Sequence, residues 1–463
     1  MFIGRENELK ELKNSFLSNK FESIIIYGRR RVGKTEIIKE SIKSYKNPIV
    51  HYECKKTSLA SNLNYLTQCF TASLGFNNKI KFESYNDFFN YVFQYSVNQE
   101  FILIIDEFSF LLEEDFSIES VLAACIDIYK NISKLKLIIS GSYVTIMQKM
   151  IEYGSHSYGR FNHVLLIRPF DYFTSSLFYE NYSNEDKIKT YSVFGGLPYF
   201  NSLIDSNLSV EENIFNLIIK KDSILEHELN EMILYETKRV AYLNDLISII
   251  GQGTYKYKDI VTKIKQNKDA RPDYLLNKLI EMDILKKVVP INDKTNTKKT
   301  LYKFQDNLIH FYYKYIFNSP FSINRENPKF YYDNFIKEDF LNQYIPEKFE
   351  KIATEFLIKA NINNKIQPII MEIGTYSFND KKNKINREFD VVTLDKNGYI
   401  SYECKCTSSK IDSNIILEEE NQTKELDINF YKLGFISKNG FSNKIDKTKY
   451  NCFTLEDFYN FSN

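Results

Sequence analysis

Short apolar runs separated by amphipathic segments fill the first third of the chain. Residues 23–27, 101–105 and 135–139 are series dominated by Ile and Leu. Such runs are typical of parallel strands that are buried on both faces of a sheet. Because a helical pattern follows the first run, residues 1–165 are predicted to form an α/β domain built on a parallel sheet.

The first run ends in the octapeptide Gly28-Arg29-Arg30-Arg31-Val32-Gly33-Lys34-Thr35, and residues 36–40 begin a helix. Two glycines around four free positions before Lys-Thr form the P-loop pattern. A glycine turn between a strand and a helix directs backbone N–H groups and the helix dipole at one point, where a phosphate fits. We expect all eight residues to bind nucleotide, with Lys34 on the outer phosphates and Thr35 on Mg²⁺. A chance glycine turn is the alternative, and the strand-and-helix setting disfavours it.

The other two runs end in polar residues at the same edge of the expected sheet. Asp106 and Glu107 follow the second run, and Ser140 follows the third. We expect Asp106 to complete the Mg²⁺ site with Thr35, Glu107 to polarise the attacking water, and Ser140 to bind a phosphate oxygen or that water. Arg160 is a candidate to stabilise transition-state charge in its own site or a neighbour's; a surface Arg paired with a carboxylate is the equal alternative.

These motifs, in this order, resemble the archaeal-type family of AAA+/STAND-like P-loop ATPases. The resemblance is carried by Phe2-Ile3-Gly4-Arg5-Glu6-Asn7-Glu8-Leu9, the P-loop, Asp106-Glu107, Ser140-Gly141-Ser142, Tyr158-Gly159-Arg160 and Gly195-Gly196-Leu197-Pro198. In that family the opening motif sits by the adenine, so the resemblance implies ATP rather than GTP. No Asn-Lys-x-Asp motif, which reads guanine, follows Asp106 at the expected place.

The middle of the chain is predicted to be mainly helical. Residues 166–236 suit a helical lid over the nucleotide. Residues 237–318 follow the order of a winged helix, three helices and then a hairpin, with residues 273–282 as the recognition helix. Two groups of lysines there suit DNA phosphates: Lys294, Lys298 and Lys299 in the wing, and Lys263, Lys265 and Lys268 before the third helix. A module that contacts protein, with solvated lysines, is the equal alternative.

A second group of chemically active residues lies near the C-terminus. Residues 390–394 and 399–405 are β-rich and flank Asp395-Lys396-Asn397-Gly398, and Asn-Gly between such runs predicts a hairpin. A two-residue loop places Asp390 opposite Lys405, whereas a four-residue loop places it opposite Glu403. Both registers put all three side chains on one face, and a three-residue loop does not.

Two carboxylates beside a lysine suit Mg²⁺ or Mn²⁺, with Lys405 stabilising charge on a phosphate. Asp390 followed by Glu403-Cys404-Lys405 resembles the PD-(D/E)xK nuclease motif. The resemblance implies a restriction-endonuclease-like α/β domain over residues 329–463, in which an upstream helical Glu joins the metal ligands Asp390 and Glu403; Glu350 is the best candidate. The alternative is that these charges pair with one another on an exposed hairpin, and a preserved site can also bind DNA without cutting it.

Composition adds few constraints. The 463 residues carry a formal net charge of +1, which gives no global signal for nucleic acid or membrane. Six cysteines include no CxxC pair, so neither a zinc ribbon nor a disulfide framework is indicated. The N-terminus lacks the pattern of a signal peptide, and the apolar runs are too short to cross a membrane. We expect a soluble cytoplasmic protein.

Taken together, the sequence predicts an α/β protein that binds and hydrolyses ATP. Its nucleotide state would control a winged helix and a C-terminal domain that binds DNA and could cleave it. The rival hypothesis is a non-catalytic nucleotide switch that acts by self-association or by assembly with a protein partner.

Overall fold

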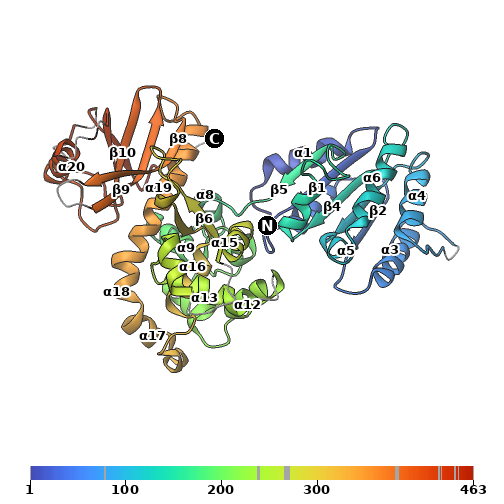
Figure 1. Ribbon diagram of the computed structural model, residues 1–463, viewed down its shortest axis with the longest axis horizontal. Coiled ribbons are helices and arrows are strands. Elements are labelled where there is room, and N and C mark those ends of the chain that lie inside the picture. The colour runs from blue at the N-terminus through green and yellow to red at the C-terminus, as the bar shows by residue number, and fades with distance from the viewer. Residues whose placement is uncertain are drawn as a thin grey trace. The chain divides into compact units, whose positions relative to one another are not determined.

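The chain folds as two compact units, Met1–Pro169 and Phe170–Asn463 (Figure 1). The structure is a computed structural model. It describes residues 2–77, 80–236, 240–264, 272–380, 385–425, 428, 430–442, 445–446 and 448–461. The first boundary lies four residues beyond the one expected at residue 165. The finer division of the second unit into three domains stays a prediction.

The first unit is built on a five-stranded parallel sheet in the order β2-β3-β4-β1-β5. Its strands are β1 (Glu22–Tyr27), β2 (Ile49–Glu53), β3 (Ile102–Asp106), β4 (Lys136–Gly141) and β5 (His163–Leu166). Every residue of β3 and β4 is buried, so both faces of the sheet are covered, as the apolar runs predicted. Because β4 lies between β1 and β3, the carboxyl ends of these three strands are neighbours.

Seven helices of the first unit surround this sheet in the described residues. They are α1 (Glu6–Phe16), α2 (Lys34–Ile42), α3 (Leu59–Ser73), α4 (Tyr85–Tyr95), α5 (Ser109–Glu114), α6 (Ser117–Tyr129) and α7 (Val144–Lys149). The second of them begins at Lys34, directly after the glycine loop, so the octapeptide joins a buried strand to a helix N-terminus as expected.

The second unit begins with the helices expected for residues 166–236. They are α8 (Tyr172–Ser176), α9 (Asn184–Phe194), α10 (Pro198–Asn201), α11 (Val210–Ile214), the π-helical turn η1 (Phe215–Ile219) and α12 (Ile224–Glu236). After α9 the backbone packs closely on Phe170. A Cβ on Gly196 would lie 1.9 Å from the carbonyl oxygen of Phe170. No larger residue fits there without moving the backbone.

Three helices and a hairpin follow in the order that the sequence predicted. They are α13 (Val240–Gly251), α14 (Tyr257–Ile264), α15 (Pro272–Glu281), β6 (Leu285–Val288), the 3₁₀ turn η2 (Thr297–Lys299) and β7 (Leu301–Phe304). An isolated bridge joins Lys256 to Leu301 beside the antiparallel pair β6–β7. The helix α15 buries Leu275, Leu276 and Leu279 at helical spacing. Lys265 and Lys268 lie outside the described residues.

A helical segment leads from this hairpin to the C-terminal sheet. It comprises α16 (Asn307–Tyr315), η3 (Ser322–Glu326), α17 (Pro328–Phe335), α18 (Lys337–Asp339), the π-helical turn η4 (Phe340–Tyr344) and α19 (Ile345–Ile362). Its long last helix packs an apolar stripe that includes Phe349, Ile352 and Phe356 against the sheet that follows.

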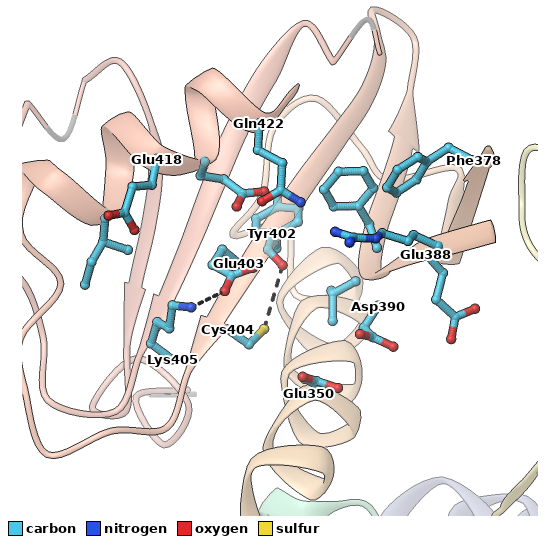
Figure 2. A pocket seen from close by; sticks show the side chains of 15 residues that line it. Glu350, Phe378, Glu388, Asp390, Tyr402, Glu403, Cys404, Lys405, Glu418 and Gln422 are labelled. Atoms are coloured by element: carbon cyan, nitrogen blue, oxygen red, sulfur yellow. Dashed lines mark hydrogen bonds and ion pairs between the residues drawn. The ribbon is translucent and has the colours of Figure 1, made fainter. Parts of the chain in front are cut away.

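The C-terminal sheet is mixed and has five strands in the order β12-β11-β10-β9-β8. Its elements are β8 (Glu372–Asp380), β9 (Ile385–Asp395), β10 (Gly398–Lys405), α20 (Ser413–Glu425), β11 (Lys432–Ser437) and β12 (Asn451–Thr454). Ile400 and Tyr402 pack with α19, whereas Leu433 and Phe435 pack with Ile416 of α20. The two helices therefore cover opposite faces of the sheet (Figures 1 and 2).

The register of the β9–β10 hairpin is one of the two that the sequence left open. Leu394 pairs with Tyr399, and the ladder runs on to Val392 and Ser401. Continued along both strands, this register places Asp390 opposite Glu403. This is the pairing expected for the four-residue loop, although Asp395 and Gly398 also pair and leave only Lys396 and Asn397 in the loop. The register keeps Asp390, Glu403 and Lys405 on one face.

The loop between β6 and β7 covers the free edge of strand β8. The Ile291 N–H donates to the carbonyl oxygen of Thr375 at 2.8 Å. The side-chain amide of Asn292 donates to the carbonyl oxygen of Ser377 and accepts from the Ser377 N–H. Gly374 permits this approach, because a Cβ there would lie 2.9 Å from Ile291 Cγ2. The edge is thereby protected from pairing with another chain.

Two of the wing lysines take part in this intramolecular interface. Lys294 forms an ion pair with Glu372 at 2.7 Å, and Lys299 bonds Ser377 Oγ at 2.8 Å. Lys298 stays exposed. Lys294 and Lys299 are therefore engaged within the chain rather than solvated, and DNA contact by the wing stays a prediction.

Candidate functional site

The glycine loop after β1 adopts a conformation that its two glycines make possible. Gly28 and Gly33 have φ of 154° and 91°. A Cβ on Gly28 would lie 2.3 Å from the carbonyl oxygen of Ile167. Lys34 is 5% exposed, and its ammonium donates to the carbonyl oxygens of Gly28 at 3.0 Å and Arg29 at 3.1 Å. The lysine thus lies over the loop that would hold the phosphates.

Residues from two strand ends and from the first turn of α2 meet beside this loop. The Thr35 hydroxyl donates to Asp106 Oδ2 at 2.7 Å, and the Ser140 hydroxyl donates to Asp106 Oδ1. Asp106 and Ser140 are almost completely buried. The structure therefore brings together Thr35, Asp106 and Ser140, which the sequence placed at one edge of the sheet.

Glu107 is held by a residue to which the sequence gave no role. Its Oε2 accepts hydrogen bonds from the Ser142 hydroxyl at 2.6 Å and from the Ser142 N–H at 3.0 Å. Glu107 itself has φ of 52°, an uncommon conformation for a residue with a side chain. Ser142 lies two residues after Ser140, so the Ser-Gly-Ser turn was the signal that could have identified it.

The opening motif contacts the same loop. The Arg5 guanidinium donates to the carbonyl oxygens of Val32 at 3.4 Å and Arg168 at 2.6 Å. This contact joins the N-terminal segment to both the glycine loop and the end of the first unit. Phe2–Leu9 is thus placed beside the candidate nucleotide site.

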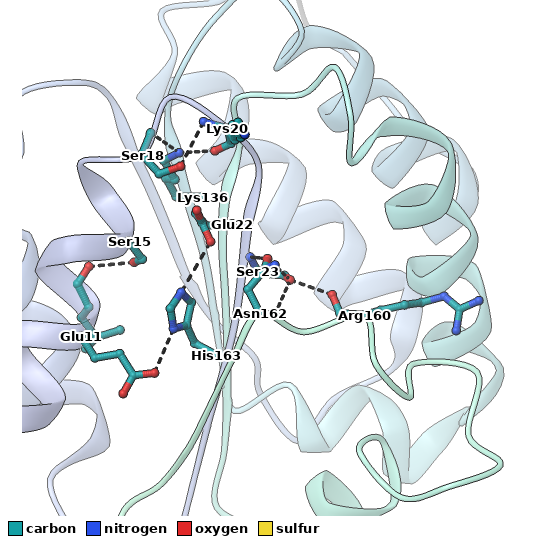
Figure 3. Close-up of polar contacts among 11 residues, drawn as sticks. Glu11, Ser15, Ser18, Lys20, Glu22, Ser23, Lys136, Arg160, Asn162 and His163 are labelled. Carbon is teal, nitrogen blue, oxygen red and sulfur yellow. Dashed lines mark hydrogen bonds and ion pairs between the residues drawn. The ribbon is translucent and has the colours of Figure 1, made fainter.

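Arg160 lies at the wrong end of the sheet to act on a nucleotide bound by its own chain. The Ser23 hydroxyl donates to its carbonyl oxygen at 2.7 Å, which places it beside the start of β1 (Figure 3). The glycine loop follows the other end of that strand, roughly 16 Å away at about 3.3 Å per residue. The Arg160 guanidinium instead pairs with Asp127 at 2.6 Å. This surface ion pair was the equal alternative to a catalytic role. The placement does not bring Arg160 to its own site, and a role in a neighbour's site stays a prediction.

The residues present fit a nucleotide with Mg²⁺. The hydroxyl of Thr35 and the carboxylate of Asp106 are hard oxygen donors of the kind that Mg²⁺ prefers. The glycine loop leaves no room for a Cβ at Gly28, and the start of α2 directs backbone N–H groups at the loop. Lys34 adds a cation within the same loop.

A second candidate site is a pocket of about 480 Å³ in the C-terminal sheet. All four residues expected there line it: Glu350, Asp390, Glu403 and Lys405 (Figure 2). Glu350 projects from α19, and the other three come from β9 and β10. Acidic residues that the sequence did not single out also line the pocket: Glu388, Glu418 and Glu419. The alternation of β9 was the signal for Glu388, two residues before Asp390.

Burial and mutual repulsion hold protons in this pocket. Burial raises the pKa of Glu350 to about 8, and the Asp390 charge adds to that rise. Burial also raises the pKa of Glu419 to about 7, with a contribution from Glu403. Several carboxyls that are close together in a half-buried pocket therefore cannot all ionise at neutral pH.

Lysines neutralise part of this acidic pocket. Lys405 pairs with Glu403 at 2.5 Å. Lys303, from strand β7, lies 3.5 Å from both Glu388 and Asp390. Within the described ranges, no group of three or more His, Cys, Asp or Glu side chains is arranged to hold a metal ion. The four expected residues thus share one pocket without forming a closed ligand set.

No helix in the part of the chain that the structure describes is long and apolar enough to span a bilayer.

Two family profiles match the chain. The family described as an ATPase domain predominantly from Archaea matches residues 2–202, and the family described as archaeal and bacterial proteins of unknown function matches residues 312–425. An uncharacterized protein of Methanocaldococcus jannaschii, MJECL04, is 30% identical over 398 residues, which cover 86% of this chain and 85% of that protein. An uncharacterized ATP-binding protein of the same organism, MJ0423, is 48% identical over 46 residues, 10% of this chain and 78% of that protein.

Two solved structures share part of the architecture. The Walker-type ATPase of Pyrococcus abyssi has a TM-score of 0.47 and 19% identity, over 68% of this chain and 96% of its own. The ORC2 protein of Aeropyrum pernix in ADPNP–ADP complexes has a TM-score of 0.47 and 14% identity, over 70% of this chain and 94% of its own. At these values the assignment depends on the sequence matches. The chain belongs to the same family as the Methanocaldococcus jannaschii protein MJECL04, and its N-terminal part is an archaeal-type P-loop ATPase domain.

Proposed function

We propose that this protein hydrolyses ATP and that its nucleotide state controls a winged helix and a nuclease-like C-terminal domain. The observation that carries the proposal is the hydrogen-bonded group of Thr35, Asp106 and Ser140 beside the loop that contains Lys34. In this division residues 1–165 are the ATPase core, 166–236 the lid, 237–318 the winged helix and 329–463 the nuclease-like domain.

Each residue of the first site has a separate task in this proposal. Backbone N–H groups of residues 28–35 bind the phosphates, and Lys34 leaves its two carbonyl partners to bind the outer ones. Thr35 and Asp106 hold Mg²⁺, which supplies charge neutralisation on the phosphates when bound. Glu107 orients the attacking water once it leaves Ser142, and Ser140 binds the γ-phosphate or that water.

The three helices and hairpin of residues 240–304 support the winged-helix assignment by their order. Two lysines of the wing are engaged with strand β8. DNA phosphates could bind Lys294 and Lys299 after that interface opens, which gives the nucleotide state something to control. The exposed face of α15 carries Asp273, Asn277 and Glu281, a poor match for a phosphate backbone.

The C-terminal pocket supports a metal-dependent DNA site. Asp390 and Glu403 lie on one face of the sheet, Lys405 adjoins Glu403, and Glu350 completes the pocket from α19. In the proposal the three carboxylates hold Mg²⁺ or Mn²⁺, and Lys405 stabilises charge on the phosphate.

A non-catalytic switch is the second candidate. It is favoured by the pairing of the pocket acids with Lys303 and Lys405, which leaves no closed set of three metal ligands in the described residues. In this version ATP and ADP would alter the interface between the hairpin loop and β8, and the altered surface would bind a protein partner or a second copy.

A nicking assay on supercoiled DNA separates the two candidates. The full-length protein is incubated with Mg²⁺ or Mn²⁺ and with no nucleotide, ADP or ATP. Metal-dependent nicking that disappears in both Asp390→Ala and Lys405→Ala, but persists in the control Glu372→Ala, supports the nuclease. Glu372 is a suitable control because it pairs with Lys294 at the covered edge and does not line the pocket. No nicking in any nucleotide state would favour the switch.

A further inference from the structure

The acidic pocket receives a lysine from a different part of the chain. Lys303 belongs to β7 of the hairpin, 87 residues before Asp390. Its ammonium lies 3.5 Å from Glu388 Oε1 and 3.5 Å from Asp390 Oδ1. The side chain is 25% exposed, so solvent screens these charges only in part.

The backbone around Lys303 is firmly held. Its neighbours Tyr302 and Phe304 are buried, and Phe304 stacks on His310 with ring centroids 4.4 Å apart. The Tyr302 N–H donates to the carbonyl oxygen of Tyr255 at 2.8 Å. The ammonium is therefore directed at the pocket by a fixed strand rather than by a free surface loop.

The hairpin is also fixed on the C-terminal sheet by contacts away from the pocket. Ile291 and Asn292 bond the backbone of β8, and Lys294 pairs with Glu372. Together these contacts keep Lys303 beside Asp390 as long as the hairpin stays on the edge of β8. Docking of the hairpin and pairing of Lys303 with two carboxylates that line the pocket are thus one structural state.

We propose that Lys303 is a built-in counter-cation that competes with a divalent metal ion for Asp390 and so sets the metal affinity of the C-terminal pocket. The inference rests on the proposed function to the extent that this pocket takes Mg²⁺ or Mn²⁺. An ammonium 3.5 Å from Asp390 neutralises the carboxylate that a metal ion needs and repels a second cation at the same place. Metal binding then requires Lys303 to leave, which loosens the hairpin at its pocket end.

The test is a titration of the full-length protein with Mn²⁺ in the absence of nucleotide, with free Mn²⁺ measured by electron paramagnetic resonance. Lys303→Met, which keeps the length of the side chain and removes its charge, is expected to tighten binding about tenfold. Lys303→Gln should act in the same direction, and Lys303→Arg should keep the wild-type affinity. Both Lys303→Met and Lys303→Gln remove the charge, so the test can still be made if one of the two variants does not fold.

Two controls assign the change to the pocket. Lys287→Met removes a lysine of the same hairpin that lies over the ring of Tyr302 and is not among the residues lining the pocket, and it should leave Mn²⁺ affinity unchanged. Asp390→Asn combined with Lys303→Met should abolish the gain. The inference is overturned if Lys303→Met binds Mn²⁺ no more tightly than wild type, if Lys287→Met has the same effect, or if no binding depends on Asp390. A gain in Mn²⁺ affinity without DNA nicking would support the inference and argue against the proposed nuclease activity.

Discussion

The hydroxyl of Thr35 donates a 2.7 Å hydrogen bond to Asp106 across 71 residues of sequence. This bond joins the helix that follows the glycine loop to the strand that carries Asp106. Both oxygens are hard ligands, so a bound Mg²⁺ would find them already side by side. The arrangement is what a site that hydrolyses a magnesium–nucleotide complex needs.

Replacement of Thr35 tests that arrangement. Thr35→Ala should reduce ATP turnover at least tenfold and raise the Mg²⁺ concentration needed for half-maximal turnover, because one oxygen ligand is lost. Thr35→Ser keeps the hydroxyl and should retain most activity. Turnover measured across a Mg²⁺ titration checks both. Equal Mg²⁺ dependence of Thr35→Ala and wild type would remove Thr35 from the metal site.

Glu107→Gln should keep nucleotide binding and lose hydrolysis. The amide keeps the shape of the side chain but cannot take a proton, and loss of a general base costs about 10² to 10⁴ in rate. Fluorescent-nucleotide binding and phosphate release are the two measurements. Glu113→Gln, at an exposed position of α5, is the matched control and should behave as wild type. Full hydrolysis by Glu107→Gln would exclude the role given to Glu107.

Arg160→Ala should leave the turnover of the dilute protein within about twofold of wild type. Its guanidinium pairs with Asp127, and both side chains are more than a quarter exposed, so stability should change by at most about 1 kcal/mol. Asp127→Asn should give a similar small change. A large loss of turnover that appears only at high protein concentration would point to action in a neighbour's site. A large loss of turnover in the dilute protein would contradict the placement of Arg160 away from the nucleotide site of its own chain.

Lys348 gives a pH dependence with a defined sign. It is 2% exposed and lies 2.6 Å from His310 Nδ1. Burial lowers its pKa to about 7, below the 10.5 of an exposed lysine. Between these values the unfolded chain binds more protons than the folded one, so this lysine makes stability rise with pH. Below pH 7 both states are protonated and its contribution stays constant.

Lys348→Met should therefore show its largest stability gain relative to wild type at or below pH 7. The difference should shrink by about 2 kcal/mol between pH 7 and pH 9 in urea unfolding. Lys359→Met on the same helix, where the lysine pairs with Asp171 and is less buried, is the control for loss of a lysine from this helix. A constant difference for Lys348→Met would mean that Lys348 keeps an ordinary affinity for its proton.

The sequence predicted which residues surround the glycine loop, because its signals there are local. An uninterrupted apolar run, a glycine turn and a helix start determine the loop, and the parallel sheet brings Asp106 and Ser140 to the same edge. The C-terminal hairpin was predicted up to its register. The choice between Lys405 and Glu403 opposite Asp390 depended on which residues form the loop, and Asn-Gly did not identify Lys396 and Asn397 as those residues.

What the sequence could not predict depends on contacts between distant segments. The ion pair of Lys294 could not be predicted, because its partner Glu372 lies 78 residues away. Lys303 gave no signal for the pocket, since only the docked hairpin brings it to Asp390. Arg160 was misplaced for a similar reason, because a residue that follows a sheet strand can return to either end of the sheet.

Whether the glycine loop and Lys34 bind ATP for hydrolysis is tested by measuring ATP turnover and ATP affinity of the wild-type and Lys34→Ala proteins. We predict Mg²⁺-dependent ATP turnover by the wild-type protein. In Lys34→Ala we expect affinity to fall at least tenfold and turnover to be lost, because the ammonium that would bind the outer phosphates is gone. A folded Lys34→Ala protein that binds and hydrolyses ATP as well as wild type would contradict the assignment of Gly28–Thr35 as the ATP site.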